Sequence, residues 1–371
     1  MASTSSCEIF NTVQAYESQT LRLGGMEQRL TIPPRSADLP AQPLLETIRA
    51  AVIGDNTVIA TPFGDRRVTY ADYTASGRAL TFIEDFIADE VLPRYANTHT
   101  ESSGTGLQTT RLREDARAVI KQSVNGDDTT AVIFAGSGST GAIDKFIGMM
   151  NLRLPADLDA RYQLSSLIPA SERPVVFIGP FEHHSNELPW RESIADVVVI
   201  PEDADGHIDI DVLKARLVEF AARPLRIGSF SAASNVTGIV SDTHAISQLL
   251  HEHGALACWD FGAAAPYIDI EMNPRCDHPL AYKDAIFLSP HKFIGGPSTP
   301  GILIVRKDIV NNSVPDVVGG GTVAYVNEYE HVYLRDVEHR EEGGTPAIVE
   351  AIRAGLVFKL KNSVGIDVIR Q

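Results

Sequence analysis

The stretch Leu288-Ser-Pro-His-Lys-Phe-Ile-Gly-Gly-Pro297 directly follows a short apolar run and ends in a glycine-proline turn. It places a lysine, Lys292, next to a histidine, His291, just beyond a predicted strand. A lysine amine becomes a nucleophile, able to form a Schiff base, when burial or a nearby cation lowers its pKa. A surface lysine in a loop is the commoner use of this residue type, so the rest of the chain has to decide between these two interpretations.

Short apolar runs of β-type residues give this stretch its place in the fold. The runs cover Ala131–Phe134, Pro174–Ile178, Val197–Ile200, Leu225–Phe230, Ala255–Trp259, Ala285–Leu288 and Ile302–Val305. Between them lie helical patterns, one over Ile143–Met150 and one that begins after Asp242 and ends at Gly254. Strands that are apolar on both faces, separated by amphipathic helices, predict a three-layer α/β fold with a mostly parallel sheet. Because ligands bind at the carboxyl ends of such strands, residues that follow a strand are the first site candidates.

The composition is that of an ordinary globular protein, with 44% hydrophobic and 22% charged residues among 371. A net charge of −16 opposes binding to a phosphate backbone, so we expect no nucleic-acid partner. The start of the chain is polar and no apolar run reaches the length of a membrane span, so we expect neither a signal peptide nor membrane association. The cysteines, Cys7, Cys258 and Cys276, have no disulfide spacing, which favours a reducing, cytoplasmic location.

A glycine-rich turn, Phe134-Ala-Gly-Ser-Gly-Ser-Thr-Gly-Ala142, lies between a predicted strand and a predicted helix. Glycines let backbone N–H groups approach an anion, and a helix N-terminus favours negative charge. Ser139 and Thr140 add hydroxyl donors. The turn therefore suits a phosphate, although an ordinary strand-to-helix turn remains an equal alternative for this pattern taken alone.

Two other segments place polar side chains after strands. Asp260 ends an apolar run, where a carboxylate could keep a pyridinium nitrogen protonated and so make its ring accept electrons, or could simply cap a helix or a turn. His183 and His184 follow Phe181, and an aromatic ring there could stack on a planar cofactor. Adjacent histidines rarely converge on one ion and no further ligand has the right spacing, so we expect no metal.

Together these segments resemble the class V aminotransferases, the fold-type-I group of pyridoxal-phosphate (PLP) enzymes that includes cysteine desulfurases and selenocysteine lyases. The resemblance runs from about Tyr70 to Ala347, with the motifs in the order found in the family. The matching segments are Tyr70–Ser76, Asn97-Thr-His99, Gly138-Ser-Thr140, Glu182-His183 with Pro189-Trp190, Ser234-Asn-Val-Thr-Gly238, Asp260, Ser289-x-His-Lys292 and Glu342-Gly-Gly-Thr-Pro346.

The resemblance implies a role for each matched residue. Lys292 would hold PLP as a Schiff base, His183 would stack on its ring, and Asp260 would pair with the ring nitrogen. The implied cofactor-binding set is Gly138, Ser139, Thr140, His183, Asn235, Asp260, Ser289, His291, Lys292 and Thr345. The implied substrate-binding set is Ala75, His99 and Asn235. In the family the threonine at the position of Thr345 reaches the phosphate of the other subunit, which implies a homodimer.

The implied function is a PLP-dependent transferase or lyase that acts on an amino acid through an external aldimine, in the manner of a cysteine desulfurase or lyase. The implied domains are an N-terminal arm with part of a small domain (1–60), a PLP-binding large domain (61–345) and the start of an incomplete C-terminal small domain (346–371). Two departures keep an alternative open, a catalytically impaired PLP-fold protein with a binding or regulatory role. Ala263 stands where the family often has glutamine, and no cysteine matches the desulfurase nucleophile. The sequence leaves the substrate and the reaction type undetermined.

Overall fold

The computed structural model describes residues 41–98, 103–276 and 278–371, which form two compact units. The first unit comprises the described residues of Met1–Ile120 together with His291–Thr299 and Ala347–Gln371. The second comprises Lys121–Pro290 and Pro300–Pro346. Most of the expected N-terminal arm, and the candidate His99, lie outside the described residues.

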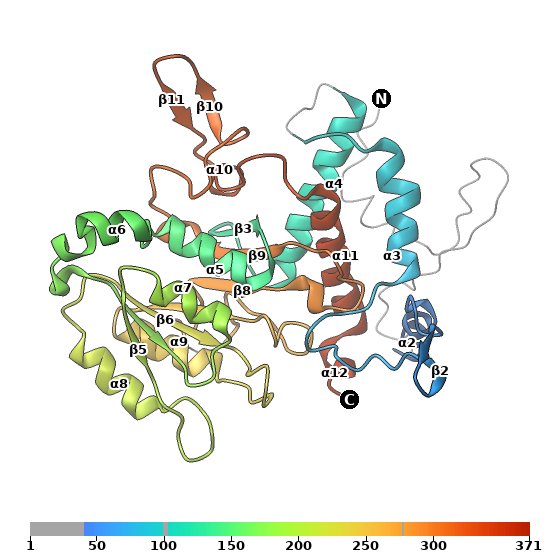
Figure 1. Cartoon of the computed structure of the whole chain (residues 1–371), viewed down its shortest axis with the longest axis horizontal. Helices are drawn as coiled ribbons and strands as arrows, with labels where there is room; N and C mark the ends of the chain where they lie inside the picture. The colour runs from blue at the N-terminus through green and yellow to red at the C-terminus, as the bar shows by residue number, and fades with distance from the viewer. Residues whose placement is uncertain (1–40, 99–102, 277) are drawn as a thin grey trace. The chain divides into compact units, whose positions relative to one another are not determined.

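The second unit is built on a seven-stranded sheet with the strand order β3-β9-β8-β7-β6-β4-β5 (Figure 1). Its strands are β3 (Thr130–Ala135), β4 (Val175–Ile178), β5 (Asp196–Val199), β6 (Arg226–Ser231), β7 (Leu256–Asp260), β8 (Ala285–Leu288) and β9 (Gly301–Arg306). β9 runs antiparallel to both of its neighbours, whereas the pairs from β8 across to β5 are all parallel. The mostly parallel sheet predicted from the apolar runs is therefore confirmed.

The strands form where they do because their side chains are buried on both faces. Every residue of β3, β4 and β8 is buried, as expected for a sheet covered by helices on its two sides. One side of the core gathers large aromatic rings, with Phe146 in edge-to-face contact with both Trp190 and Phe287. This dense core fixes the ends of the strands, from which the loops that carry the polar side chains emerge.

Which face of the sheet a helix covers depends on whether its connection runs toward the β5 edge of the sheet or away from it. The connection from β3 to β4, with α5, and the connection from β4 to β5, with α7, run toward one edge of the sheet, whereas α8 and α9 lie in connections that run back. Right-handed crossovers then place these two groups on opposite faces, as the ribbon shows (Figure 1). The helices of this unit are α5 (Gly138–Met149), α6 (Ala156–Tyr162), α7 (Leu188–Arg191), α8 (Ile210–Glu219), α9 (Thr243–Glu252) and α10 (Val337–Arg340).

The ends of α9 follow the sequence prediction closely. The carboxylate of Asp242 accepts hydrogen bonds from the backbone N–H groups of His244 and Ala245, at 3.2 and 3.0 Å. These bonds satisfy donors that the first turn of a helix leaves unpaired. Beyond the helix, Gly254 adopts a positive φ of 67°, which suits glycine because it has no Cβ.

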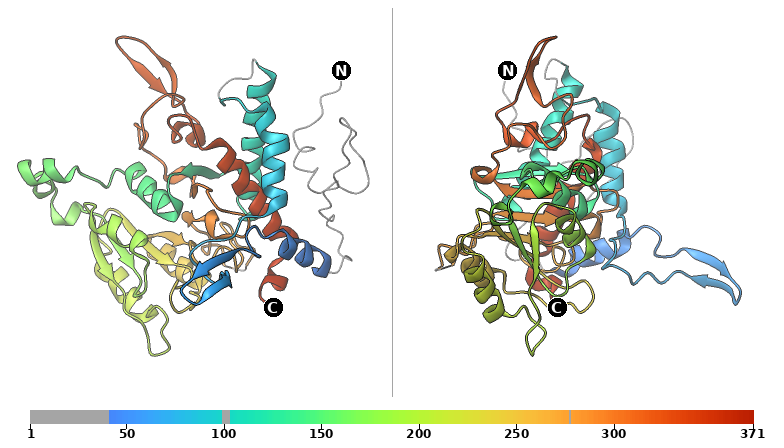
Figure 2. Two further views of the ribbon diagram at one scale, coloured as in Figure 1. Left: turned by 45° about the vertical axis from the view of Figure 1, so that its right-hand side comes forward. Right: turned by 60° about the vertical axis from the view of Figure 1, so that its left-hand side comes forward.

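Shorter elements and a hairpin complete the second unit. The short helical turns are η3 (Leu164–Leu167), η4 (Ala170–Glu172), η5 (His184–Asn186) and η7 (Lys307–Ile309). The antiparallel pair β10 (Val323–Val326) and β11 (His331–Tyr333) forms a hairpin that extends away from the sheet (Figure 2). Its apolar side chains are unusually exposed, with Val326 at 68% and Tyr329 at 87%.

The first unit is mainly helical and carries the segment with Lys292. Its elements are α2 (Ala41–Ala51), β1 (Val58–Thr61), β2 (Gly64–Arg67), α3 (Thr81–Phe86), η1 (Ile87–Val91), η2 (Leu92–Arg94), α4 (Gly104–Ser123), η6 (Pro290–Lys292), α11 (Ile348–Val364) and α12 (Ile366–Ile369), with the ends of α4 and η6 shared with the second unit. α4 and α11 can pack closely because Gly355 has no side chain. A Cβ at that position would lie only 2.6 Å from Ala116. α3 continues without a break into the wider π-helical turn of η1.

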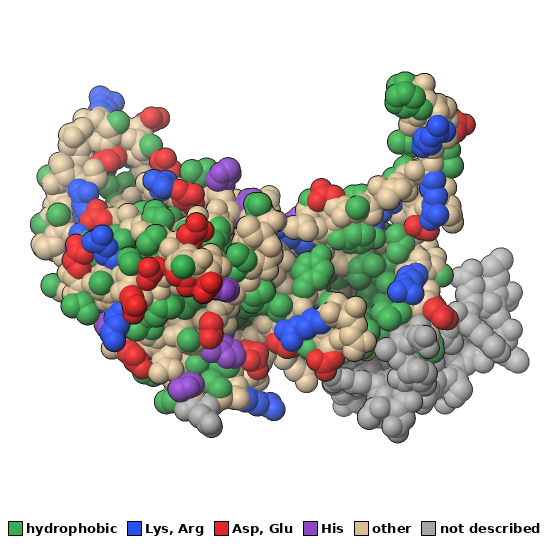
Figure 3. Space-filling view, turned by 90° about the horizontal axis from the view of Figure 1, so that it is seen from below, with side chains coloured by type: hydrophobic (Ala, Val, Ile, Leu, Met, Phe, Trp, Pro, Cys, Tyr) green, Lys and Arg blue, Asp and Glu red, His purple; other side chains and the backbone are tan. Residues whose placement is uncertain are grey.

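The surface mixes charges of both signs. On the face drawn in Figure 3, acidic and basic side chains are interspersed. Among the described residues, no helix combines the length and the hydropathy needed to cross a membrane.

Candidate active site

The chain reverses its direction across the sheet between β4 and β6, and a partly buried acid, Glu182, lies at this point. β4 connects outward to β5, whereas β6 connects back toward β7, so two loops diverge there. Such a switch point is where open α/β sheets bind ligands. Glu182 joins the two strand ends, because its carboxylate accepts hydrogen bonds from the N–H of Gly179 at 3.1 Å and of Ser231 at 2.9 Å.

Glu182 is further held by polar side chains. Its carboxylate accepts from the Ser231 hydroxyl at 2.6 Å and from the Asn186 amide at 2.7 Å. Asn186 in turn accepts from the Trp190 indole and from Ser229. Burial raises the pKa of Glu182 to about 7, although the hydrogen bonds from Ser231 and Asn186 act to lower it. The negative charge of Asp260 adds to the rise.

The glycine-rich turn and Ser289 meet at the start of α5. The backbone N–H of Ser139 donates to the Ser289 hydroxyl at 2.7 Å, although 150 residues separate the two in sequence. Gly138 adopts a positive φ of 57°, and its carbonyl lies so close to Gly301 that a Cβ there would come within 1.8 Å. The turn therefore needs its glycines, and it brings two predicted phosphate-binding serines together.

Asp260 lies beside these serines. A Cβ built on Gly262 would lie 2.9 Å from the Asp260 carboxylate, 2.9 Å from the Ser139 hydroxyl and 3.5 Å from the Ser289 hydroxyl. All three side chains are at least nine-tenths buried, and Asp260 Oδ1 accepts from the Gly262 N–H at 2.7 Å. Two hydroxyls and one carboxylate thus converge on Gly262 near the ends of β7 and β8, too closely for any side chain at that position.

His183 approaches the same turn through a serine. His183 Nδ1 lies 2.9 Å from the Ser185 hydroxyl and 3.1 Å from the Ser185 backbone N–H. The Ser185 hydroxyl lies 2.6 Å from that of Thr140 in the first turn of α5. The structure therefore links the predicted stacking ring to the predicted phosphate turn.

In the first unit, the Lys292 segment is tied to the predicted substrate segment. The N–H of Gly77 donates to the His291 carbonyl at 2.8 Å, and Gly295 donates to the Arg78 carbonyl at 2.7 Å. A Cβ on Gly77 would come within 1.9 Å of the Phe293 carbonyl. Burial, with the charge of Lys292, lowers the pKa of His291, so its ring is neutral at physiological pH.

The remaining predicted residues stand apart from these contacts. Ala75 is exposed two residues before Gly77. Asn235 is exposed in the turn that follows β6, and no hydrogen bond among the described residues joins its side chain to the cluster. Thr345 is exposed beyond Gly344, whose N–H donates to the Gly320 carbonyl at 2.9 Å.

Sequence reasoning missed three residues of this site. Glu182 was noted only as part of a motif, and its bonds to Gly179 and Ser231 depend on β4 and β6 being neighbours. Ser185 carries no signal beyond its place after a histidine pair. Gly262 could have been singled out, because a glycine two residues after a strand-end Asp is a common sign of close approach. Among the described residues, no group of three or more His, Cys, Asp or Glu side chains could hold a metal ion.

A hydroxyl-lined turn, a buried strand-end aspartate and a nearby imidazole lie at the strand ends of a mostly parallel sheet, which defines an α/β protein. The family described as aminotransferase class-V matches residues 69–371, and this chain belongs to that family. It is 28% identical over 311 residues to a probable cysteine desulfurase of Halalkalibacterium halodurans, covering 82% of this chain and 69% of the relative. It is 26% identical over 328 residues to a probable cysteine desulfurase of Staphylococcus epidermidis, covering 86% and 72%.

Solved structures show the same fold. A cysteine desulfurase from Thermococcus onnurineus matches with a TM-score of 0.68 at 18% identity, over 87% of this chain and 72% of that chain. A cysteine desulfurase from Escherichia coli matches with a TM-score of 0.60 at 21% identity, over 80% and 68%. The resemblance to class V aminotransferases predicted from the motifs is confirmed, and so is the fold class.

Proposed function

We propose that this chain binds pyridoxal phosphate and acts on an amino-acid substrate, with chemistry of the cysteine desulfurase or lyase type. The observation that carries the proposal is the convergence of Ser139, Ser289 and Asp260 around Gly262. Membership of the class V family supports it, as do the names of the two bacterial relatives.

The residues present fit this cofactor. Hydroxyls of Ser139, Thr140 and Ser289 beside the N-terminus of a twelve-residue helix suit a phosphate dianion. A buried carboxylate at Asp260 suits a protonated pyridine nitrogen. Gly262 lets these three side chains approach one another, because a Cβ there would lie 2.9 Å from both Asp260 and Ser139. We propose that these residues, with His183 stacked on the ring, hold the cofactor.

Lys292, Asp260 and His291 then each have a separate chemical role. When bound, the cofactor supplies an aldehyde that captures amines and a ring that accepts electrons from the α-carbon of the substrate. We propose that Lys292 would hold the cofactor through its amine, and that its Nζ would accept the α-proton of the substrate. The Asp260 carboxylate would keep the ring nitrogen protonated. His291 is neutral, because burial and Lys292 lower its pKa, so it can donate one hydrogen bond without adding a second positive charge.

The described cysteines bear on the kind of chemistry proposed. Cys258 is fully buried in β7, and burial raises the pKa of its thiol, so it is suited to packing rather than to attack on sulfur. Cys276 is a free, exposed thiol. We therefore propose an amino-acid substrate without assigning either cysteine as a sulfur acceptor. Free thiols also support the proposed cytoplasmic location.

We also propose a homodimer in which Thr345 contributes to the phosphate site of the partner subunit. Thr345 is exposed and lies close in sequence to a hairpin whose apolar side chains face solvent. The hairpin base and the Thr345 segment are joined through the bond from Gly344 N–H to Gly320. An exposed apolar arm next to a predicted cross-subunit residue is the feature that a dimer interface would cover.

The test is covalent trapping at Lys292. The wild-type protein, mixed with PLP and reduced with borohydride, should carry the cofactor on the peptide that contains Lys292, as measured by mass spectrometry. Lys292→Ala should lose both the visible absorbance and the trapped mass, while Lys214→Ala, an exposed control on α8, should keep them. Trapping that persists in Lys292→Ala would overturn the assignment. Trapping at Lys292 without a spectral response to a panel of amino acids that includes cysteine would instead favour the binding or regulatory alternative.

A further inference from the structure

Ser185 occupies an unusual position, because it contacts His183 through two different atoms. Its backbone N–H lies 3.1 Å from His183 Nδ1, and its hydroxyl lies 2.9 Å from the same nitrogen. A backbone N–H can only donate, so Nδ1 must hold a lone pair. The single ring proton of a neutral His183 is therefore on Nε2.

The hydroxyl of Ser185 has one proton and two neighbours. One is His183 Nδ1, which can only accept, and the other is the Thr140 hydroxyl at 2.6 Å. If Ser185 donates to His183, it can accept from Thr140. If Ser185 instead donates to Thr140, the Thr140 proton is available to an anion in the glycine-rich turn. These two directions of the same chain of hydrogen bonds exclude each other.

We infer that Ser185 is a positioning residue that couples the ring of His183 to the anion-binding turn through Thr140. An anion beside Thr140 accepts a hydrogen bond from the Thr140 hydroxyl, and successive hydrogen bonds that point toward a charge strengthen one another. Ser185 then turns its proton from His183 to Thr140, and Nδ1 keeps only the backbone bond. The inference rests on the proposed function for the identity of the natural anion, but the coupling itself concerns only this chain's residues.

The test uses inorganic phosphate as the probe, because phosphate does not stack on His183. The ¹⁵N chemical shift of His183 Nδ1, assigned with His183→Gln, is followed during a phosphate titration of the intact protein. We expect a shift on phosphate binding in the wild type and none in Ser185→Ala. Thr140→Val removes the hydroxyl at the other end of this chain of hydrogen bonds. It should also abolish the response, although His183 itself is unchanged.

Affinity and rescue provide a second readout. Loss of one hydrogen bond should raise the dissociation constant for phosphate roughly 3- to 10-fold in Ser185→Ala. Ser185→Thr keeps the hydroxyl and should restore both the shift and the affinity, while Ser166→Ala, a surface control, should behave as wild type. A wild-type His183 signal that ignores phosphate, or one that responds equally in Ser185→Ala, would overturn the coupling. Covalent trapping of PLP at Lys292 is measured separately, so failure of the cofactor proposal is distinguishable from failure of this one.

Discussion

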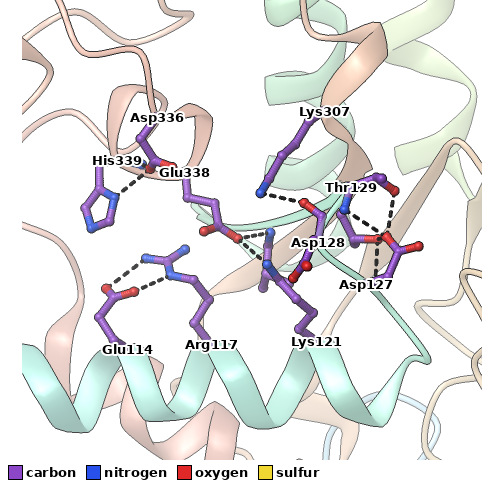
Figure 4. Close-up of polar contacts among 12 residues, drawn as sticks. Glu114, Arg117, Lys121, Asp127, Asp128, Thr129, Lys307, Asp336, Glu338 and His339 are labelled. Carbon is purple, nitrogen blue, oxygen red and sulfur yellow. Dashed lines mark hydrogen bonds and ion pairs between the residues drawn. The ribbon is translucent and has the colours of Figure 1, made fainter.

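Glu342 Oε1 accepts a hydrogen bond from the backbone N–H of Phe134 at 2.7 Å, across 208 residues of sequence. Glu338 makes the matching bond to the N–H of Val132 at 2.8 Å and also lies 3.3 Å from the Lys121 ammonium (Figure 4). β3 is an edge strand, so these N–H groups face away from the sheet and toward the two carboxylates. The two carboxylates therefore close the edge and fix the strand that leads into the glycine-rich turn.

Removing the Glu342 carboxylate should destabilise this edge. Glu342→Ala removes a hydrogen bond from a buried backbone N–H to a carboxylate, and losing such a bond costs about 1–3 kcal/mol of the free energy of unfolding. Glu342→Gln retains an oxygen acceptor and should cost less. Urea denaturation measures both, with Glu172→Ala as a control at an exposed position. A loss in Glu342→Ala no larger than that of the control would show that the edge bond contributes nothing.

The contact between Gly77 and the Lys292 segment predicts a position that tolerates no side chain. In Gly77→Ala the new Cβ would lie 1.9 Å from the Phe293 carbonyl, a backbone atom that cannot move without shifting its neighbour Lys292. We expect a stability loss of about 1–3 kcal/mol together with much weaker borohydride trapping at Lys292. The matched control is Gly104→Ala, because a Cβ at Gly104 meets no atom within 4 Å. Wild-type trapping in Gly77→Ala would contradict the proposed role of this contact.

How much of this site the sequence could predict depends on whether an interaction is local. The cap of α9 by Asp242 is local, and so are the buried strands, because burial on both faces leaves a continuous apolar run. The bond between Thr140 and Ser185 joins residues 45 apart, and the contact between Ser76 and the His291 carbonyl spans 215 residues. Such pairs depend on which strands and loops become neighbours, and no periodicity in the chain records that. The family resemblance named candidate residues, and it could not predict their hydrogen-bond partners.

The buried position of Glu182 predicts a pH dependence of stability. Its pKa rises from the unfolded value of 4.5 to about 7, so the folded state holds a proton that the unfolded state has released. The contribution of Glu182 to the free energy of unfolding therefore falls as the pH rises from about 4.5 to about 7. Above that range this contribution no longer changes with pH. Glu182→Gln cannot titrate and should lack this component, as thermal melts across the range would show. Parallel pH profiles for wild type, Glu182→Gln and the exposed control Glu192→Gln would contradict the assigned pKa.

The exposed hairpin predicts how the proposed dimer could be weakened. Val326→Ser and Tyr329→Ser remove apolar surface from side chains that are 68% and 87% exposed, so the fold itself should be little affected. We expect the double variant to shift sedimentation toward the monomer at a given concentration and to lower PLP affinity, because Thr345 of the partner subunit would be lost. An unchanged mass would remove the hairpin from the proposed interface.

A substitution at Asp260 can separate the effect of its negative charge from the effect of its size and shape. Asp260→Asn keeps the size of the side chain and an oxygen that can still accept from the Gly262 N–H, so the loop should remain in place. It removes the negative charge, and a charge-assisted hydrogen bond is worth about 1.5–3 kcal/mol, or roughly a 10- to 100-fold weaker retention of PLP. The same change lowers the basicity of the bound ring nitrogen, so the visible spectrum of the trapped cofactor should alter even at saturating PLP.

Equilibrium dialysis measures the first effect and absorbance the second, with Asp205→Asn as an exposed control. Weakened binding with an unaltered spectrum would mean that Asp260 shapes the loop without contacting the ring nitrogen, because a purely structural role would reduce occupancy but leave the electronic state of the bound cofactor as it was.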